Sequence, residues 1–68
     1  MSINDMLDAG ITIQGNVLVK ETDKYFCSHM LFNDNAEWLD RSNEWMDWEV
    51  TYMYPEDELI CIEVKEED

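Results

Sequence analysis

The sequence is poor in basic residues, glycine, proline and cysteine, and each shortage excludes a class of protein. Four Lys and Arg stand against seventeen Asp and Glu, so repulsion disfavours direct binding to a nucleic-acid backbone. Two glycines and one proline leave no glycine-rich phosphate loop and no serine nucleophile elbow. No apolar run approaches the roughly 18–20 residues of a membrane span. We therefore expect a protein that binds neither nucleic acid nor membrane.

The two cysteines, Cys27 and Cys61, indicate a compartment rather than a site. Residues 1–10 lack the basic start of a secretory signal, which favours reduced core thiols and a cytoplasmic location. Cys27 and His29 share a strand face, and they would form a three-ligand metal site only if Cys61 approached them. Two residues at this spacing are weak evidence for such a site. We predict no metal and no cofactor.

The acidic balance is the most unusual property of the chain. Its 68 residues carry a formal charge of −13, yet 46% of them are hydrophobic and three are Trp, so the chain folds as one small domain over 1–68. The charge is roughly twice what suits a domain of this size, and self-repulsion opposes compaction. Solubility alone is the simplest explanation of such a charge. A cationic partner is the alternative.

Periodicity predicts a helix followed by a hairpin in the first half. Ser2 and Asp5 form a capping pair before a short helix within 1–10, which Gly10 ends. From Ile11 the apolar residues alternate, with Gly15 placed for a bulge, and a second strand, rich in aromatics, is expected over Tyr25–Phe32. We expect the first hairpin over 11–32.

The segment 34–47 contains two similar tetrads seven residues apart. The tetrad Glu37–Asp40 returns as Glu44–Asp47, and each has Trp at its second position. Asp34 and Glu37 have capping-box spacing, so we expect a helical segment on which both Trp side chains share a face, with acids beside them.

Alternation resumes over 48–65 and predicts the second hairpin. Residues 48, 50, 52 and 54 share one face, Pro55–Glu58 form the turn, and Ile60, Ile62 and Val64 point to the core while Cys61 points outward. Residues 66–68 are an acidic tail. The expected fold is α+β, with a short N-terminal helix and a Trp-rich helical connection packed on a four-stranded antiparallel sheet of two hairpins.

The acids from residue 34 onward are the candidate contact surface. Paired carboxylates are too numerous to single out a catalytic pair, and a core this small can hardly enclose a substrate pocket, so we predict no enzyme. Carboxylates along these segments would instead present a phosphate-like array to a protein that grips nucleic acid. The predicted contacts are Glu37, Asp40, Glu44, Asp47, Glu49, Glu56, Asp57 and Glu58, with Trp38 and Trp45 as anchors.

Two stretches, Ile3–Val17 and Met46–Pro55, resemble small acidic proteins encoded by phages and mobile elements. Anti-CRISPR proteins and other counter-defence inhibitors occur in that setting, and several imitate DNA. The resemblance implies an inhibitor that binds a CRISPR effector such as Cas9, in the cytoplasm of a bacterial host, and blocks its DNA-binding channel.

Two other interpretations stay open. The chain is an acidic adaptor or antitoxin-like partner of a basic host protein, in which the acids give steering and specificity. Alternatively, two copies pair through sheet edges or the Trp-rich segment to supply core that one chain lacks. We expect a monomer or a weak homodimer.

Overall fold

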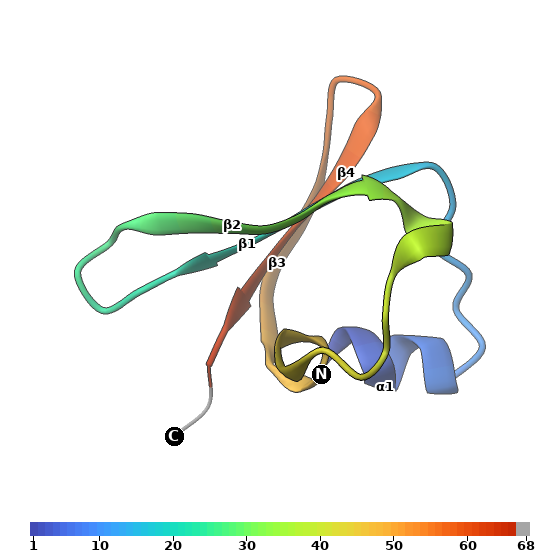
Figure 1. The fold of residues 1–68 in the computed structure, drawn as a ribbon, viewed down its shortest axis with the longest axis horizontal. Coiled ribbons are helices and arrows are strands. Elements are labelled where there is room, and N and C mark those ends of the chain that lie inside the picture. Colours follow the sequence, from blue (N-terminus) through green and yellow to red (C-terminus); the bar gives the residue numbers. More distant parts are fainter. Residues whose placement is uncertain (67–68) are drawn as a thin grey trace.

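The computed structural model describes residues 1–66, which form one α-helix, two short 3-10 helices and four strands (Figure 1). In chain order the elements are α1 (Ile3–Asp8), β1 (Asn16–Thr22), β2 (Ser28–Asn35), η1 (Ala36–Trp38), η2 (Glu44–Asp47), β3 (Glu49–Glu56) and β4 (Leu59–Lys65). The α+β class, the N-terminal helix and the four strands are confirmed. Most of the expected acidic tail, residues 67 and 68, lies outside the described residues.

Helix α1 has the ends that its sequence predicts. The Ser2 hydroxyl accepts from the Asp5 amide at 3.0 Å, and the Asp5 carboxylate accepts from the Ser2 amide at 2.9 Å, which completes a capping box. At the other end, the amides of Gly10 and Ile11 donate back to carbonyls in the last turn. Gly10 has a φ of 87°, the left-handed conformation that closes a helix in this way.

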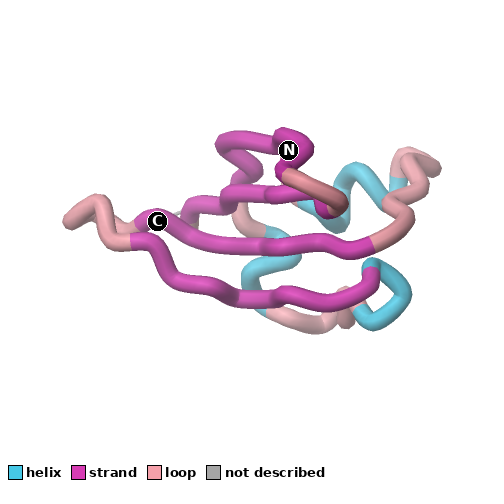
Figure 2. The backbone as a smooth tube through the Cα atoms, turned by 90° about the horizontal axis from the view of Figure 1, so that it is seen from above, coloured by secondary structure: helices cyan, strands magenta, loops and turns pink. Residues whose placement is uncertain are grey.

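The sheet is mixed, so the prediction of a wholly antiparallel sheet is wrong. Its strand order is β2-β1-β4-β3. Each predicted hairpin is present and antiparallel, but the two inner strands, β1 and β4, pair in parallel from Asn16 with Leu59 to Glu21 with Val64. Figure 2 shows the four strands from a second direction.

The chain path between the hairpins explains the parallel pair. Strand β2 finishes at the end of the sheet where Asn35 pairs with Asn16, whereas β3 starts at the opposite end, where Glu49 pairs with Lys65. Residues 36–48 therefore run the length of the sheet, and the second hairpin joins the sheet from the end opposite to Asn35. The inner strand of that hairpin must then run in the same direction as β1.

The core lies between one face of the sheet and the segments that cross it. In Figure 1, α1 and η2 lie beneath the strands and η1 lies beside them. The buried cluster takes residues from α1, η2 and the two inner strands, namely Ile3, Met6, Val17, Val19, Met46, Ile62 and Val64. We call the other side of the sheet, from which Lys20, Tyr54 and Glu63 project, the open face.

The connection is not the helix predicted over 34–47. Asn35, rather than Asp34, caps η1 by accepting from the Glu37 amide at 3.0 Å. After η1 the chain becomes extended, and the Asp40 carboxylate then accepts from both the amide and the hydroxyl of Ser42, at 2.9 and 2.6 Å. Such local side-chain bonds compete with helical hydrogen bonds, which is why two short turns replace one helix.

The first hairpin is shorter at its start and longer at its end than predicted. Residues 11–15 are not strand, and Ile11 is 48% exposed, so its place in the alternating pattern was misleading. Gly15, with a φ of 83°, turns the chain into β1. Strand β2 starts three residues later than expected, at Ser28, because the carboxylate of Asp23 organises residues 23–27 as a loop.

Two details of the second hairpin also differ. Pro55 and Glu56 belong to β3 and pair with β4, so the turn is Asp57–Glu58 alone. Proline is tolerated there because β3 is an edge strand. A register shift between Val50 and Tyr52 moves later side chains to the other face, so Val50 packs on the core while Tyr52 lies on the open face.

The two cysteines have different surroundings. Cys61 is free and fully buried, although it lies on the open face of β4, as the alternation predicts. Cys27 is free and exposed, so the expectation that it is a core thiol is wrong. The loop position of Cys27 explains the difference, since residues 23–27 project beyond the paired strands.

Candidate functional site

All eight acids predicted as contacts are exposed: Glu37, Asp40, Glu44, Asp47, Glu49, Glu56, Asp57 and Glu58. The fold divides them into separate groups. Four lie on the connection that covers the sheet, one lies at the start of β3, and three lie at the β3–β4 turn. Figure 1 shows that turn at the top of the molecule and η2 at the bottom.

The four acids of the connection join two acids that the sequence analysis missed. We call this set the acidic layer; it comprises Asp5, Asp8, Glu37, Asp40, Glu44 and Asp47, all exposed. Asp5 and Asp8 are far from the others in sequence, and they lie near Glu44 and Asp47 because α1 packs beside η2; Glu37, on η1, lies farther along the connection (Figure 1). The sequence did contain one indication of this arrangement: the helical spacing of Ile3 and Met6 predicts that α1 packs on the core.

A network of hydrogen bonds around Asn4 holds α1 to the connection. The Asn4 side-chain amide donates to the Asp47 carboxylate at 2.8 Å and to the Arg41 carbonyl at 3.1 Å. Arg41 Nε donates to the Asn4 side-chain oxygen at 3.0 Å, and the Arg41 guanidinium also pairs with Asp8. The one basic side chain among residues 1–10 and 36–47 is therefore engaged within the layer.

Local hydrogen bonds keep at least two of these carboxylates ionised. The bond from the Ser2 amide, followed by that from the Ser2 hydroxyl, lowers the pKa of Asp5 below its ordinary value of 3.8. The bonds from Ser42 lower the pKa of Asp40 in the same way. Both side chains are exposed, so Asp5 and Asp40 present full negative charges to solvent at neutral pH.

The remaining predicted acids belong to other surroundings. Glu49 accepts from the N-terminal amine at 2.8 Å and so ties the start of the chain to β3. Glu56 ends this eight-residue strand, which spans roughly 23 Å at its usual rise, and Asp57 and Glu58 follow it. The predicted contact set is therefore two acidic surfaces rather than one.

The two tryptophans predicted as anchors do not share a face. Trp38 is 67% exposed at the end of η1. Trp45 is half-buried, packs against the core, and has its ring centroid 6.0 Å from that of Phe32. The extended residue Leu39 and the turn at Asp40 break the helical offset that would have aligned them. Of the two tryptophans, Trp38 is the exposed one.

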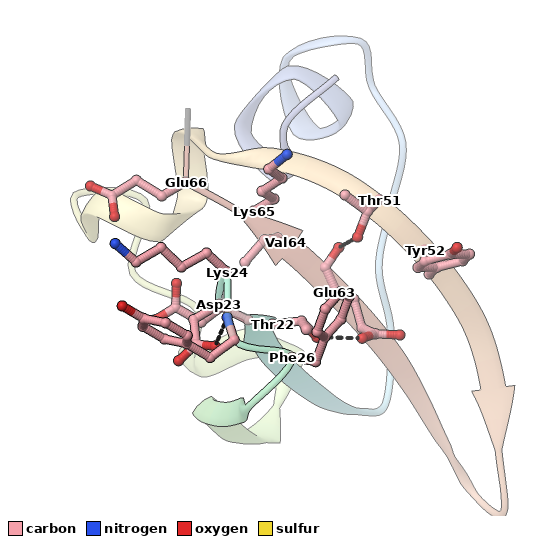
Figure 3. A pocket seen from close by; sticks show the side chains of 12 residues that line it. Thr22, Asp23, Lys24, Phe26, Thr51, Tyr52, Glu63, Val64, Lys65 and Glu66 are labelled. Atoms are coloured by element: carbon pink, nitrogen blue, oxygen red, sulfur yellow. Dashed lines mark hydrogen bonds between the residues drawn. The ribbon is translucent and has the colours of Figure 1, made fainter. Parts of the chain in front are cut away.

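The structure also contains an open groove of about 770 Å³ at the edge of the sheet. It lies between the β1–β2 loop and the neighbouring ends of β3 and β4 (Figure 3). Within residues 1–66, no group of three His, Cys, Asp or Glu side chains is arranged to hold a metal ion. No helix in that part of the chain has the length and apolar character needed to cross a membrane.

The geometry thus offers two kinds of surface: the acidic layer on the covered side of the sheet, and an aromatic groove at the sheet edge. The acidic layer consists of exposed carboxylates, which attract positive charge. Comparisons of the chain with protein-family models, with curated proteins and with solved structures gave no match.

Proposed function

We propose that this protein is a stoichiometric inhibitor of the kind carried by phages and mobile elements. It binds a basic nucleic-acid-binding defence enzyme in the bacterial cytoplasm and blocks the channel that holds DNA. A Cas9-type CRISPR effector is the expected partner, because such effectors hold their heteroduplex in a positively charged channel. The inhibitor works as a monomer, by occupancy, without catalysis and without a cofactor.

The acidic layer is the observation that carries this proposal. Six exposed carboxylates lie on α1 and the connection, and the one basic side chain there, Arg41, is already paired with Asp8. The layer thus carries six carboxylates against one guanidinium, on a molecule whose dimensions are 31 × 26 × 17 Å. Because the supporting segments pack on the core through Ile3, Met6 and Met46, the carboxylates are held on a folded scaffold.

The physical basis is competition for the same cations. A DNA-binding channel gains affinity by exchanging small counterions for phosphates, and protein carboxylates exploit the same attraction. Electrostatic complementarity also accelerates encounter, and it loses strength as ionic strength rises. Inhibition of this type therefore has two signatures, namely mutual exclusion with DNA and a strong salt dependence.

The first prediction compares two variants of equal charge. Glu37→Gln with Glu44→Gln removes two carboxylates of the acidic layer, whereas Glu56→Gln with Glu58→Gln removes two from the β3–β4 turn. We expect the first pair to weaken binding to Cas9 about three- to tenfold, in line with exposed charge pairs, and the second pair to change it less than twofold. Affinities are measured by calorimetry at fixed salt, with DNA displacement followed by fluorescence anisotropy.

Other results would contradict the proposal. Equal binding to an effector whose DNA site is already filled, with no weakening at higher salt, would show that the acids do not act as a DNA substitute. Recovery of a basic host protein without nucleic-acid-binding activity as the sole partner would instead favour the adaptor or antitoxin-like role.

A further inference from the structure

The groove at the sheet edge has an unusual concentration of exposed aromatic side chains. Tyr25 is 72% exposed, Phe26 is 89% exposed and Tyr52 is 65% exposed, and all three line the same depression. Tyr52 projects from β3 beside Glu63, its cross-strand partner on β4, while Phe26 reaches the groove from the β1–β2 loop (Figure 3). Large apolar rings gathered at one exposed position are typical of contact sites.

The loop that carries Phe26 is held in one shape. The Asp23 carboxylate accepts from the amides of Tyr25 and Cys27 at 2.8 and 3.0 Å, and it also bonds the ring of His29 at 3.0 Å. The Phe26 amide donates to the Asp23 carbonyl at 3.0 Å. Phe26 itself has a φ of 62°, a left-handed conformation that bulky residues rarely adopt. The fold therefore keeps an aromatic ring exposed at a position that would favour glycine or asparagine.

The tyrosines of this region already attract cations within the chain. Lys24 Nζ lies 5.2 Å from the centroid of the Tyr25 ring, and Lys20 Nζ lies 5.9 Å from that of Tyr54 on the open face. Both distances are within the range of cation–π attraction. Two carboxylates that follow the loop in sequence line the groove, Glu63, which accepts from the Thr22 hydroxyl at 3.1 Å, and Glu66; the lysines Lys24 and Lys65 line it as well.

We propose that this groove, which we call the aromatic groove, receives arginine side chains of the basic partner protein. Guanidinium planes stack on Phe26 and Tyr52, and Glu63 and Glu66 pair with their charge. Arginine suits the groove better than lysine because it stacks on rings and binds carboxylates with two parallel bonds. The inference rests on the proposed function for its partner, and adds a second contact surface beside the acidic layer. A second copy of this chain is a poor occupant, since each copy carries a charge of −13.

A short peptide tests the groove without any effector. Tetra-arginine is titrated into the ¹⁵N-labelled protein at about 150 mM salt, where the Debye length is about 8 Å. We expect the largest amide shifts at residues 22–26, 51, 52 and 63–66, and weaker binding of tetra-lysine. The double substitution Phe26→Ser with Tyr52→Ser is expected to weaken tetra-arginine binding about five- to tenfold. Met30→Ser removes a similarly exposed apolar side chain from β2, outside the groove; it is the matched control and should leave binding within twofold.

The opposite results would overturn the inference. Shifts confined to residues 37–47, or equal losses in the double variant and in Met30→Ser, would show that arginine is attracted only by the overall charge. A dimer in sedimentation experiments that requires Phe26 would assign the groove to a second copy. Tetra-arginine is not a nucleic-acid-binding protein. If it failed to bind the groove, the prediction that this protein competes with DNA for an effector would still stand and would be tested separately. Conversely, loss of that competition would not remove arginine binding by the groove.

Discussion

Asp5 has two roles at the level of a single residue. Its carboxylate completes the cap of α1 by accepting from the Ser2 amide, and its charge belongs to the acidic layer. Acids at the start of a helix are stabilised by capping hydrogen bonds and by the helix dipole, so Asp5 contributes a negative charge at a position where it also stabilises α1. The acids Glu56, Asp57 and Glu58 lie at the other end of the molecule, at and beyond the last paired residues of β3 and β4.

Asp5→Ala tests the cap and its pH dependence. We expect a fall of a few degrees in melting temperature at pH 7, because the substitution removes one hydrogen-bond acceptor from the helix start. Since folding lowers the pKa of Asp5 from 3.8, its contribution is present above that pH and is lost as the pH falls through the folded-state pKa. The difference between the two proteins should therefore shrink in acid, as measured by thermal unfolding followed by circular dichroism.

Glu44→Ala is the control for this experiment. It removes one charge from the same layer but leaves the α1 cap intact. A loss of stability as large as that of Asp5→Ala, or a difference that persists unchanged at pH 2, would contradict the role of the cap.

Individual residue roles were predicted unevenly, and the reason is local context. The Ser2–Asp5 cap was predicted correctly because its partners are three residues apart. Trp38 and Trp45 occupy equivalent positions in the two similar tetrads yet differ in burial, since only Trp45 packs against Phe32 on β2. This contact involves a strand outside the tetrads, so the sequence of the tetrads cannot predict it.

At the level of elements, the short η2 helix is the main support of the acidic layer. Its Met46 side chain is fully buried among residues of α1, β1 and β4, and Asp47 is bonded to Asn4. A four-residue 3-10 helix has little stability of its own, so its position depends on this apolar contact. Loss of the contact should release the connection from the sheet.

Met46→Ala is expected to destabilise the protein by about 2–5 kcal/mol, the usual cost of truncating a buried large side chain. For a chain of this size, with a total stability of about 3–10 kcal/mol, this change leaves the fold marginal. Met46→Leu, which conserves volume, should cost less than about 1.5 kcal/mol. The measurement is urea unfolding followed by tryptophan fluorescence.

Trp38→Ala supplies the contrast, since its side chain is exposed and its truncation should change stability by less than about 0.5 kcal/mol. If Trp38→Ala destabilised the protein as much as Met46→Ala, the distinction between exposed and core positions on the connection would be wrong.

Strands could be predicted where apolar and polar residues alternate without interruption, and their facing residues could not be predicted where that alternation shifts. The alternation of Val17 and Val19 located β1, and that of Ile62 and Val64 located β4. The register shift at Thr51 reversed the faces of the residues that follow in β3, because one extra residue inverts every later side chain. The sequence contains no proline or glycine at that position to signal it.

At the level of the whole molecule, the charge acts over the full size of the domain. The longest dimension is 31 Å, close to the Debye length of about 30 Å at 10 mM salt, so at low salt nearly all the carboxylates repel one another. At about 0.1 M salt the Debye length is about 10 Å, and only neighbouring charges interact. Repulsion between distant parts of the compact state is then largely removed.

We therefore expect the melting temperature to rise when NaCl is increased from 10 to 500 mM at constant pH. The physical reason is that screening relieves the self-repulsion of a chain with a charge of −13. Differential scanning calorimetry measures the effect. The variant with Gln at positions 37, 44, 56 and 58 has four fewer carboxylates and should show a shallower rise. A fall in melting temperature with salt would mean that ion pairs such as Arg41–Asp8 outweigh the repulsion.

The sequence alone determined the α+β class, the helix cap, the two hairpins and the large negative charge, because each depends on neighbours in the chain or on composition. Only the tertiary structure decided that β1 and β4 run parallel and that Asp5 and Asp8 join the acids of the connection. It also decided that Phe26 and Tyr52 line the same groove. Those arrangements follow from the path of residues 36–48 across the sheet, and such a long-range path leaves no periodic trace in the sequence.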